Sequence, residues 1–265
     1  GIRDVERSRG LGDVYKRQEQ IIGTAALLNW KNIEFRGGNR LFQKQTHSLQ
    51  YYRHFLLMDD EAKLLKNLKD SYRRNIRKAE RNGIIVKIDN SPDSLEEFYK
   101  LNCITRKKHG LPPQPIKFFR NVFDQIIKNR YGCIFQARFQ NKIIASAIYF
   151  HFNNTAIYKY GASDIAHLPL RANNLLMWEA IKYFSAQDYQ LLDFGKTEFV
   201  NEGLRRFKKG WGSTEEIFHY YKYNFLTQKF ETDRNKETGW YNNVFKNMPT
   251  PVLKLIGKIL YRYVG

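Results

Sequence analysis

The order of its hydrophobic patterns constrains the fold of this chain more than any other feature. Between residues 59 and 225 the patterns follow one another as helix, strand, two helices, three strands joined by short turns, helix, strand, helix and strand. A helix is recognised by apolar residues every three or four positions, and a half-buried strand by their alternation. Such an order builds a mixed sheet with helices packed on its faces. We therefore predict an α/β (α+β) fold, with a mixed, twisted sheet flanked by helices.

The first of these helices carries two distinct faces. Asp59 or Asp60 can cap its N-terminus, and Gly83 ends it. Its apolar face comprises Ala62, Leu65, Leu68, Tyr72, Ile76 and Ala79, and its basic face comprises Lys66, Lys69, Arg73, Arg77 and Arg81, widened by Arg74 and Lys78. Two interpretations stay open. The basic stripe binds phosphate or anionic headgroups, with Arg74 and Arg77 among the binding residues, or it is the solvent-exposed side of an amphipathic helix.

The later patterns predict the remaining elements of the sheet and its helices. We expect strands at 84–88, 133–139, 143–152, 155–160, 190–194 and 216–225, and helices at 93–108, 115–129, 171–187 and from about 202. Three cations, Arg106, Lys107 and Lys108, lie in the last turn of the 93–108 helix. Cations at that end favour the helix dipole, which by itself could account for the cluster.

A strand-loop-helix unit near the C-terminal end holds the candidate site. Leu191 and Leu192 lead into Asp193, Gly195 is expected to end the strand, and a short helix then carries Phe207 and Lys208 before Gly210 and Gly212 stop it. This arrangement places a lysine at the carboxyl edge of a sheet, where α/β proteins bind ligands. Asp193 and Thr197 flank the loop and are candidate substrate-binding residues. The alternative is a solvated basic helix whose aromatic residues pack in the core.

The charge of the chain favours anionic partners. Lys and Arg number 45 against 26 Asp and Glu, which gives a net charge of +19. Nucleic acid, phosphorylated substrates and an acidic membrane face all fit this surplus. Two cysteines, Cys103 and Cys133, make no disulfide framework, and no apolar stretch predicts a membrane span or a secretory signal. We expect a cytoplasmic protein, and no histidine spacing predicts a metal site.

Four further segments flank the predicted domain, which we place at residues 59–230. Residues 13–18 resemble the translation of a transposon adapter, so we expect 1–18 to be a non-native segment, or else a disordered basic tail. Residues 19–58 are predicted to form short strands, the last ones of a preceding domain that would be truncated. A linker is expected at 231–248. The last segment, 249–265, predicts an amphipathic helix that either lies on an anionic membrane or docks on the body.

Five motifs of this chain occur together, in this order, in one known family. They are 73–79 with Gly83, 105–113, 160–163, 193–195 and 203–212. The chain thereby resembles the FemAB family of tandem GNAT-like transferases, which includes relatives linked to envelope polysaccharide export. The resemblance covers residues 59–225 and matches the second of the family's two GNAT-like halves. It implies a GNAT-like acyltransferase fold, with residues 19–58 as the remnant of the first half.

The same resemblance implies a reaction and roles for particular residues. Family members move an aminoacyl or acyl group to an amine of a cell-envelope precursor, such as a peptidoglycan stem peptide or a polysaccharide. Lys208 matches the lysine that stabilises the oxyanion, Phe207 its aromatic neighbour, and Tyr160 lies near an acceptor-site tyrosine. The family's phosphate-binding arginine has no clear equivalent in this sequence. The candidates for its role are Arg106, Lys107 and Lys108. The implied donor is aminoacyl-tRNA, with no tightly bound cofactor and no metal.

Two alternatives to this reaction stay open. A GNAT enzyme that uses acyl-CoA needs a glycine-rich turn before a helix to hold the pyrophosphate, and the corresponding stretch 168–174 contains no glycine. The missing glycines disfavour the usual mode of acyl-CoA binding, but acyl-CoA stays open as a donor. A non-catalytic module that binds RNA or an anionic membrane would explain the charge with no chemistry. Aminolysis of an ester itself needs positioning and a cation at the oxyanion, which one lysine can supply.

Overall fold

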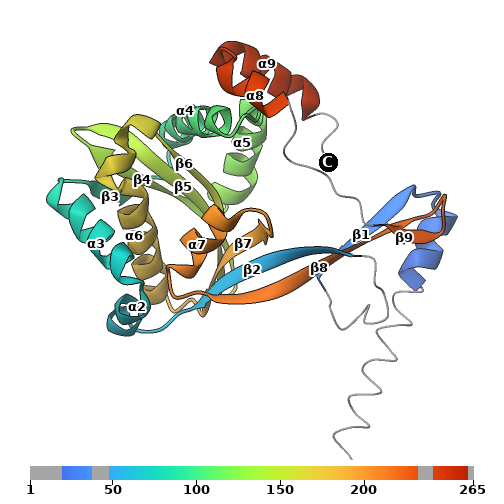
Figure 1. The fold of residues 1–265 in the computed structure, drawn as a ribbon, viewed down its shortest axis with the longest axis horizontal. Helices are drawn as coiled ribbons and strands as arrows, with labels where there is room; N and C mark the ends of the chain where they lie inside the picture. Colours follow the sequence, from blue (N-terminus) through green and yellow to red (C-terminus); the bar gives the residue numbers. More distant parts are fainter. Residues whose placement is uncertain (1–19, 38–47, 232–240, 262–265) are drawn as a thin grey trace, which may run out of the picture. The chain divides into compact units, whose positions relative to one another are not determined.

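The computed structural model describes residues 20–37, 48–231 and 241–261, and the predictions for 1–18 lie outside them (Figure 1). The chain forms two compact units. The larger unit comprises His54–Gly195, Gly203–Glu215 and the described residues from 241 onwards, and the smaller unit holds the described residues up to Arg53 with Lys196–Glu202 and 216–231.

The sheet of the larger unit contains the predicted meander. β4 (Gly132–Phe139), β5 (Lys142–Phe152) and β6 (Thr155–Ser163) are antiparallel neighbours, β3 (Ile85–Ile88) pairs with β4, and β7 (Leu191–Glu198) pairs in parallel with β6. The order β7-β6-β5-β4-β3 is therefore a mixed sheet. Its strands form because each alternates between two apolar faces, and the tight turns between them fall at polar residues. The predicted fold class is confirmed.

Helices cover both faces of this sheet (Figure 1). One face packs on α3 (Asp70–Arg81) and α6 (Ala172–Ala186), in a core that includes Ile76, Phe135, Tyr149 and Phe184. The other face packs on α4 (Pro92–Lys108) and α5 (Ile116–Val122), with a π-helical turn at Phe123–Ile127, around Phe98, Phe119 and Ile134. The side chains of successive strand residues enter the two cores alternately, as the pleat requires.

The single helix expected at 59–83 is wrong in one respect, because it is broken. α2 (Glu61–Asn67) ends and α3 begins across Leu68 and Lys69, whose backbones are extended. The break is stabilised from outside the helix, since the Lys69 amide donates to the Gly210 carbonyl at 3.0 Å. The Arg73 guanidinium donates to the carbonyl of Lys66 at 2.9 Å. The basic stripe is consequently not one continuous helical row, although the predicted cap at Asp60 is confirmed by its bond to the Lys63 amide.

The predicted end of one strand also needs correction. Gly195 does not end β7, which continues to Glu198, although Gly195 has the left-handed φ of +73° expected of a glycine at a distortion. The parallel register of β7 with β6 covers only Thr155–Ile157 opposite Leu191–Asp193. The part of β6 beyond Ile157 therefore borders a cavity, described below.

The smaller unit is mostly antiparallel. β1 (Asn32–Arg36) and β9 (Lys229–Glu231) both pair with β8 (Thr214–Asn224), and the first residues of β2 (Leu49–Leu57) belong to this unit. Residues 20–27 are helical and not a strand, because Ala25, Ala26, Leu27 and Leu28 favour helix. The Lys196 ammonium lies 4.3 Å from the ring centroid of Tyr51 and 5.2 Å from that of Tyr220.

The C-terminal part of the larger unit contains two helices. α9 (Thr250–Leu260) corresponds to the predicted terminal helix, and α8 (Tyr241–Asn247) lies inside the segment expected as a linker. No helix within the described ranges is long and apolar enough to cross a bilayer.

Candidate active site

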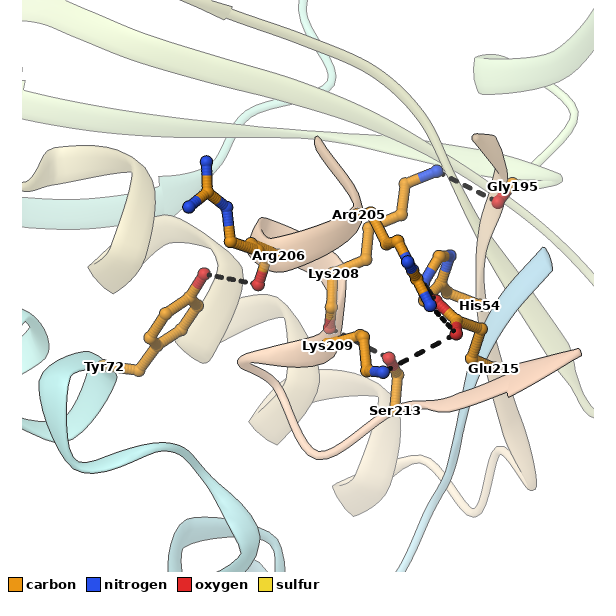
Figure 2. Close-up of polar contacts among 9 residues, drawn as sticks. All are labelled: His54, Tyr72, Gly195, Arg205, Arg206, Lys208, Lys209, Ser213 and Glu215. Atoms are coloured by element: carbon orange, nitrogen blue, oxygen red, sulfur yellow. Dashed lines mark hydrogen bonds and ion pairs between the residues drawn. The ribbon is translucent and has the colours of Figure 1, made fainter. Parts of the chain in front are cut away.

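A buried lysine is the centre of the candidate site. α7 (Glu202–Lys209) is a short helix whose last turn carries Lys208, and the side chain of Lys208 is buried with 2% of its surface exposed. Its Nζ donates a hydrogen bond to the Gly195 carbonyl at 3.0 Å, as Figure 2 shows. Helical spacing explains the contrast with its neighbours Arg206 and Lys209, which point to other sides of the helix and are exposed. Arg206 and Lys209 therefore face the solvent, whereas Lys208 points into the protein.

Burial strongly changes the acidity of this lysine. Removal from water disfavours the ammonium form and lowers the pKa of Lys208 from 10.5 to about 8, while the Asp193 carboxylate opposes the change. The lysine is then cationic at neutral pH and neutral in moderately alkaline solution. A cation held in a low-dielectric position acts more strongly on nearby charge than one in water.

An ion network fixes the helix that presents Lys208 (Figure 2). Arg205 donates to both oxygens of Glu215, with Nε–Oε2 at 2.7 Å and Nη2–Oε1 at 2.8 Å. The His54 Nε2 lies 2.9 Å from the same Oε2, and Arg205 is the main cause that lowers the pKa of Glu215 to about 2. The Ser213 hydroxyl donates to the Lys208 carbonyl at 2.9 Å. These contacts hold the last turn of α7 in place.

Phe207, the residue before Lys208, lines two small cavities. One, of about 160 Å³, is bordered by β6 residues and by α6, including Tyr158, Gly161, Asn173 and Met177. The other, of about 220 Å³, lies at the beginning of α6 and includes Asp164, His167 and Arg171. Behind Phe207, the Trp211 ring is buried and contacts Tyr72 edge-on with centroids 4.9 Å apart. Trp211 thus packs in the core as expected, while Phe207 lines cavities and Lys208 is buried beside it in the chain.

The structure places Tyr158, and not the predicted Tyr160, in the cavity with Phe207. A β-bulge in the pairing with β5 sets Tyr149 opposite Tyr158 and Ile148 opposite Tyr160, so Lys159 is the extra residue. The bulge puts the two tyrosines on opposite faces. Tyr160 packs among aromatic rings of the α4–α5 core, 5.3 Å from the Phe119 centroid, whereas Tyr158 lies over Gly161 in the cavity. The two Tyr side chains look equivalent in the sequence, and only the bulge separates them.

The glycine-free loop at the start of α6 borders the larger of the two Phe207 cavities. Arg171 adopts a left-handed conformation with φ of +64° and begins α6 in place of a glycine. The Asp164 carboxylate accepts hydrogen bonds from the Ala166 amide and from Lys142 Nζ and lies 3.0 Å from His167 Nδ1. The loop thus enters α6 through the left-handed backbone of Arg171, a conformation that residues other than glycine adopt less often.

The other predicted site residues fall in separate places. Asp193 lies on β7 and accepts from the Gly195 amide at 2.6 Å, which puts it next to the contact made by Lys208. Thr197 is buried, and its hydroxyl has no hydrogen-bond partner among the described residues. Arg74 and Arg77 are exposed on α3.

The three cations at the end of α4 lie apart from Lys208. Arg106 donates to the Pro112 carbonyl at 3.2 Å and to the Tyr261 hydroxyl at 3.3 Å, and lines a groove beside α8 and α9. Lys107 and Lys108 end the same helix. The structure therefore brings Phe207, Lys208 and Asp193 together, and places Tyr160, Arg106 and the α3 arginines elsewhere in the larger unit.

Comparison with known proteins identifies the family and the fold. The chain matches the acetyltransferase (GNAT) domain family over residues 66–209, more than half of its length. No curated protein matches it in sequence. Among solved structures it is similar to FemX, with 15% identity, a TM-score of 0.64, and coverage of 77% of this chain and 75% of FemX.

Two further structures share the fold. The C-terminal domain of a putative lysylphosphatidylglycerol synthetase from Agrobacterium fabrum has 13% identity, a TM-score of 0.54 and coverage of 76% of this chain and 70% of that one. A conserved protein of unknown function from Bacteroides thetaiotaomicron has 13% identity, a TM-score of 0.57 and coverage of 78% and 74%. Because the family model covers more than half of the chain and the mixed sheet is shared with FemX, the chain belongs to the acetyltransferase (GNAT) family and has a FemAB-like fold.

Proposed function

We propose that this chain is an N-acyltransferase in which Lys208 stabilises the oxyanion of the reaction. The observation that carries the proposal is the buried ammonium of Lys208, directed inward from α7, whose neighbour in the chain, Phe207, lines a cavity together with Tyr158. A buried cation is retained at a cost in stability, which is typical of functional groups. The family match to an acetyltransferase domain supports acyl transfer as the class of reaction.

The proposed reaction needs few protein groups. The neutral acceptor amine attacks the carbonyl carbon of a thioester or ester donor, a C–N bond forms, and the carbonyl oxygen becomes negative. Collapse of this intermediate breaks the C–S or C–O bond, and the amine loses one proton to solvent or to the leaving group. The Lys208 ammonium supplies charge where the oxyanion develops, and Phe207 with Tyr158 shapes the cavity that positions the reactants. Removal of one such donor lowers turnover by about two to three orders of magnitude in comparable sites.

The donor is acyl-CoA or aminoacyl-tRNA, and the family match favours acyl-CoA. The fold shared with FemX supports the aminoacyl alternative, as does the net charge of +19. Arg171 occupies the position where a glycine would let the backbone approach a pyrophosphate most closely. A cation at that position can meet an anion in place of backbone amides.

The acceptor is an amine of a cell-envelope precursor, a peptidoglycan stem peptide or an envelope polysaccharide, and the protein acts in the cytoplasm near the membrane. We propose phosphate binding for Arg106, Lys107 and Lys108 at the end of α4. Tyr160, Asp193 and Thr197, which lie in separate places, are each proposed as substrate-binding residues. Arg74 and Arg77 would bind an anionic partner through the exposed side of α3. Residues 59–230 form the catalytic GNAT-like domain in this proposal, and 19–58 belong to a preceding half.

The test offers the chain two labelled donors, acetyl-CoA and a pool of charged tRNA, with an extract of amine-bearing envelope precursors. Label in the acceptor from either donor supports the proposal and names the donor. The matched variants are Lys208→Met and Lys209→Met, since Lys209 lies next to Lys208 on the same helix but is exposed. Loss of transfer in the first variant alone is expected. Equal activity of both variants removes Lys208 from the mechanism, and salt-dependent RNA binding without transfer would instead indicate a binding module.

A further inference from the structure

We propose that α9 lies on an anionic phospholipid bilayer, with Val252, Leu255 and Ile259 inserted at the headgroup level. The surface is built by α8, α9 and the end of α4, all in the larger unit, at the edge where Figure 1 draws the C-terminal helices in red. It is separate from the cavities lined by Phe207. Membrane binding through this surface does not depend on the reaction at Lys208.

One side of α9 is docked firmly on the body of the unit. Leu253 and Gly257, one turn apart, are the buried residues of the helix. Gly257 packs so closely that a Cβ there would lie 2.0 Å from the Pro113 carbonyl oxygen. The Lys254 ammonium lies 5.2 Å from the ring centroid of Tyr99 on α4. These contacts fix which side of the helix faces outward.

The opposite side of the helix is apolar. Residues advance by about 100° each around a helix, so Leu255 points almost directly away from the docked side and Val252 and Ile259 flank it. Their exposed fractions are 59%, 43% and 53%. A helix that merely docks on a protein keeps its polar residues on this outward side. Here the outward side is apolar over the whole helix, with Lys258 beside it.

The charge around this face selects the partner. From Tyr241 to the C-terminal residue the sequence contains no Asp or Glu. Lys246 on α8 and Lys258 on α9 are exposed, and Lys108 at the end of α4 is exposed as well. An apolar helix face edged by lysines and free of acids is complementary to anionic headgroups over an apolar interior. A protein partner would need an apolar groove edged by acids, and a second copy of this face would bring like charges together.

A groove lies beside the C-terminal end of α9. It has a volume of about 680 Å³ and is lined by aromatic and aliphatic side chains, including Phe245 on α8 and Leu260 on α9, which is also exposed. Among the described residues that line it, only Arg106 is charged. An apolar groove with one guanidinium suits a phospholipid, whose chain fills the groove and whose phosphate pairs with Arg106. The proposed surface is the outward side of α9, with this groove next to the end of the helix.

The test measures partitioning of the full chain onto vesicles. One set contains phosphatidylcholine alone, and in the other about one third of the lipid is phosphatidylglycerol. We expect binding to the anionic set, a decrease with rising salt, and loss of at least about tenfold in Leu255→Glu/Ile259→Glu. Lys258→Gln should weaken binding roughly fivefold, because one lysine near such a surface contributes about 1 kcal/mol. The matched control is Val200→Glu/Leu226→Glu, which changes the charge equally at two residues exposed to 84% in the smaller unit.

Loss of binding in the α9 variant with retention in the control supports the proposal. Equal binding of the α9 variant and the wild-type chain overturns it, as does equal binding to neutral and anionic vesicles. Absence of vesicle binding, with a dimer that the α9 variant dissociates, overturns it in favour of a second copy. Transfer activity measured with a soluble amine in the same variants separates this outcome from a failure of the proposed function.

Discussion

Replacing Lys208 with methionine should lower the proposed transfer by about two to three orders of magnitude and at the same time stabilise the fold. Methionine has a similar length and no charge, so the buried volume stays filled while the ammonium disappears. The pKa of the buried lysine falls from 10.5 to about 8, a difference of about 2.5 units. At about 1.4 kcal/mol per unit, burial of the charged form costs about 3 kcal/mol at neutral pH.

A lost hydrogen bond offsets part of this gain. The bond from Nζ to the Gly195 carbonyl at 3.0 Å contributes on the order of 1–2 kcal/mol. We therefore expect Lys208→Met to raise the free energy of unfolding at pH 7 by about 1–2 kcal/mol. For a chain of this size, that corresponds to a rise in Tm of roughly 2–8 °C. A group kept at a net cost to stability is the signature of a site that serves catalysis.

The pH dependence gives the measurement its specificity. Between pH 8 and 10.5 the unfolded lysine holds a proton that the folded one has released, so the wild-type chain gains stability as pH rises through this window. Lys208→Met lacks this gain, and its advantage should shrink toward zero or reverse by the upper end. Denaturant unfolding at pH 7 and near pH 10, with Lys209→Met as the exposed control, measures the difference. A Lys208→Met chain that is less stable than wild type at pH 7, or whose advantage does not change with pH, would refute the reasoning.

Three further predictions follow from the same geometry. If Lys208 acts as a cation, kcat should decline as pH rises through about 8. Lys208→Arg keeps its charge and should shift that decline to higher pH. An increase of kcat with the same midpoint would instead indicate that a neutral lysine acts as a base. Gly161→Ala should lower activity, because the new Cβ would lie 1.7 Å from the Tyr158 hydroxyl. Circular dichroism should show that the variant stays folded. Adding Tyr158→Phe, which removes the hydroxyl, should restore part of the activity. Gly210→Ala should destabilise the chain by about 1–3 kcal/mol in denaturant unfolding, because its Cβ would lie 2.2 Å from the Tyr72 ring; an unchanged midpoint would show that the ring moves freely aside.

Local pattern was enough for the central part of the fold. β4, β5 and β6 begin and end close to the predicted residues because the apolar alternation is strong and the two connections are short polar turns. α4 and α6 were likewise predicted to within a residue or two, since each has an apolar face wide enough to bury against a sheet. The position of Lys208 beside Phe207 on a short helix was also predictable, because two glycines mark the end of that helix.

Other features depend on partners distant in the sequence. The 59–83 pattern is periodic throughout, yet the helix breaks at Leu68 because the Gly210 carbonyl, far along the chain, accepts the Lys69 amide. α8 has little apolar periodicity, and the Asn242 side-chain amide secures it by donating to the Gly110 carbonyl at 3.0 Å.

The sequence by itself determined the order of the elements, the surplus of positive charge and the lysine at the end of α7. Only the tertiary structure decided that this lysine is buried, that Tyr158 and not Tyr160 shares a cavity with Phe207, and that α9 keeps an apolar side outward. The physical reason is the same in each case. Periodicity tells which residues share a face of one element, but a bulge can turn that face over, and burial depends on which other element packs against it.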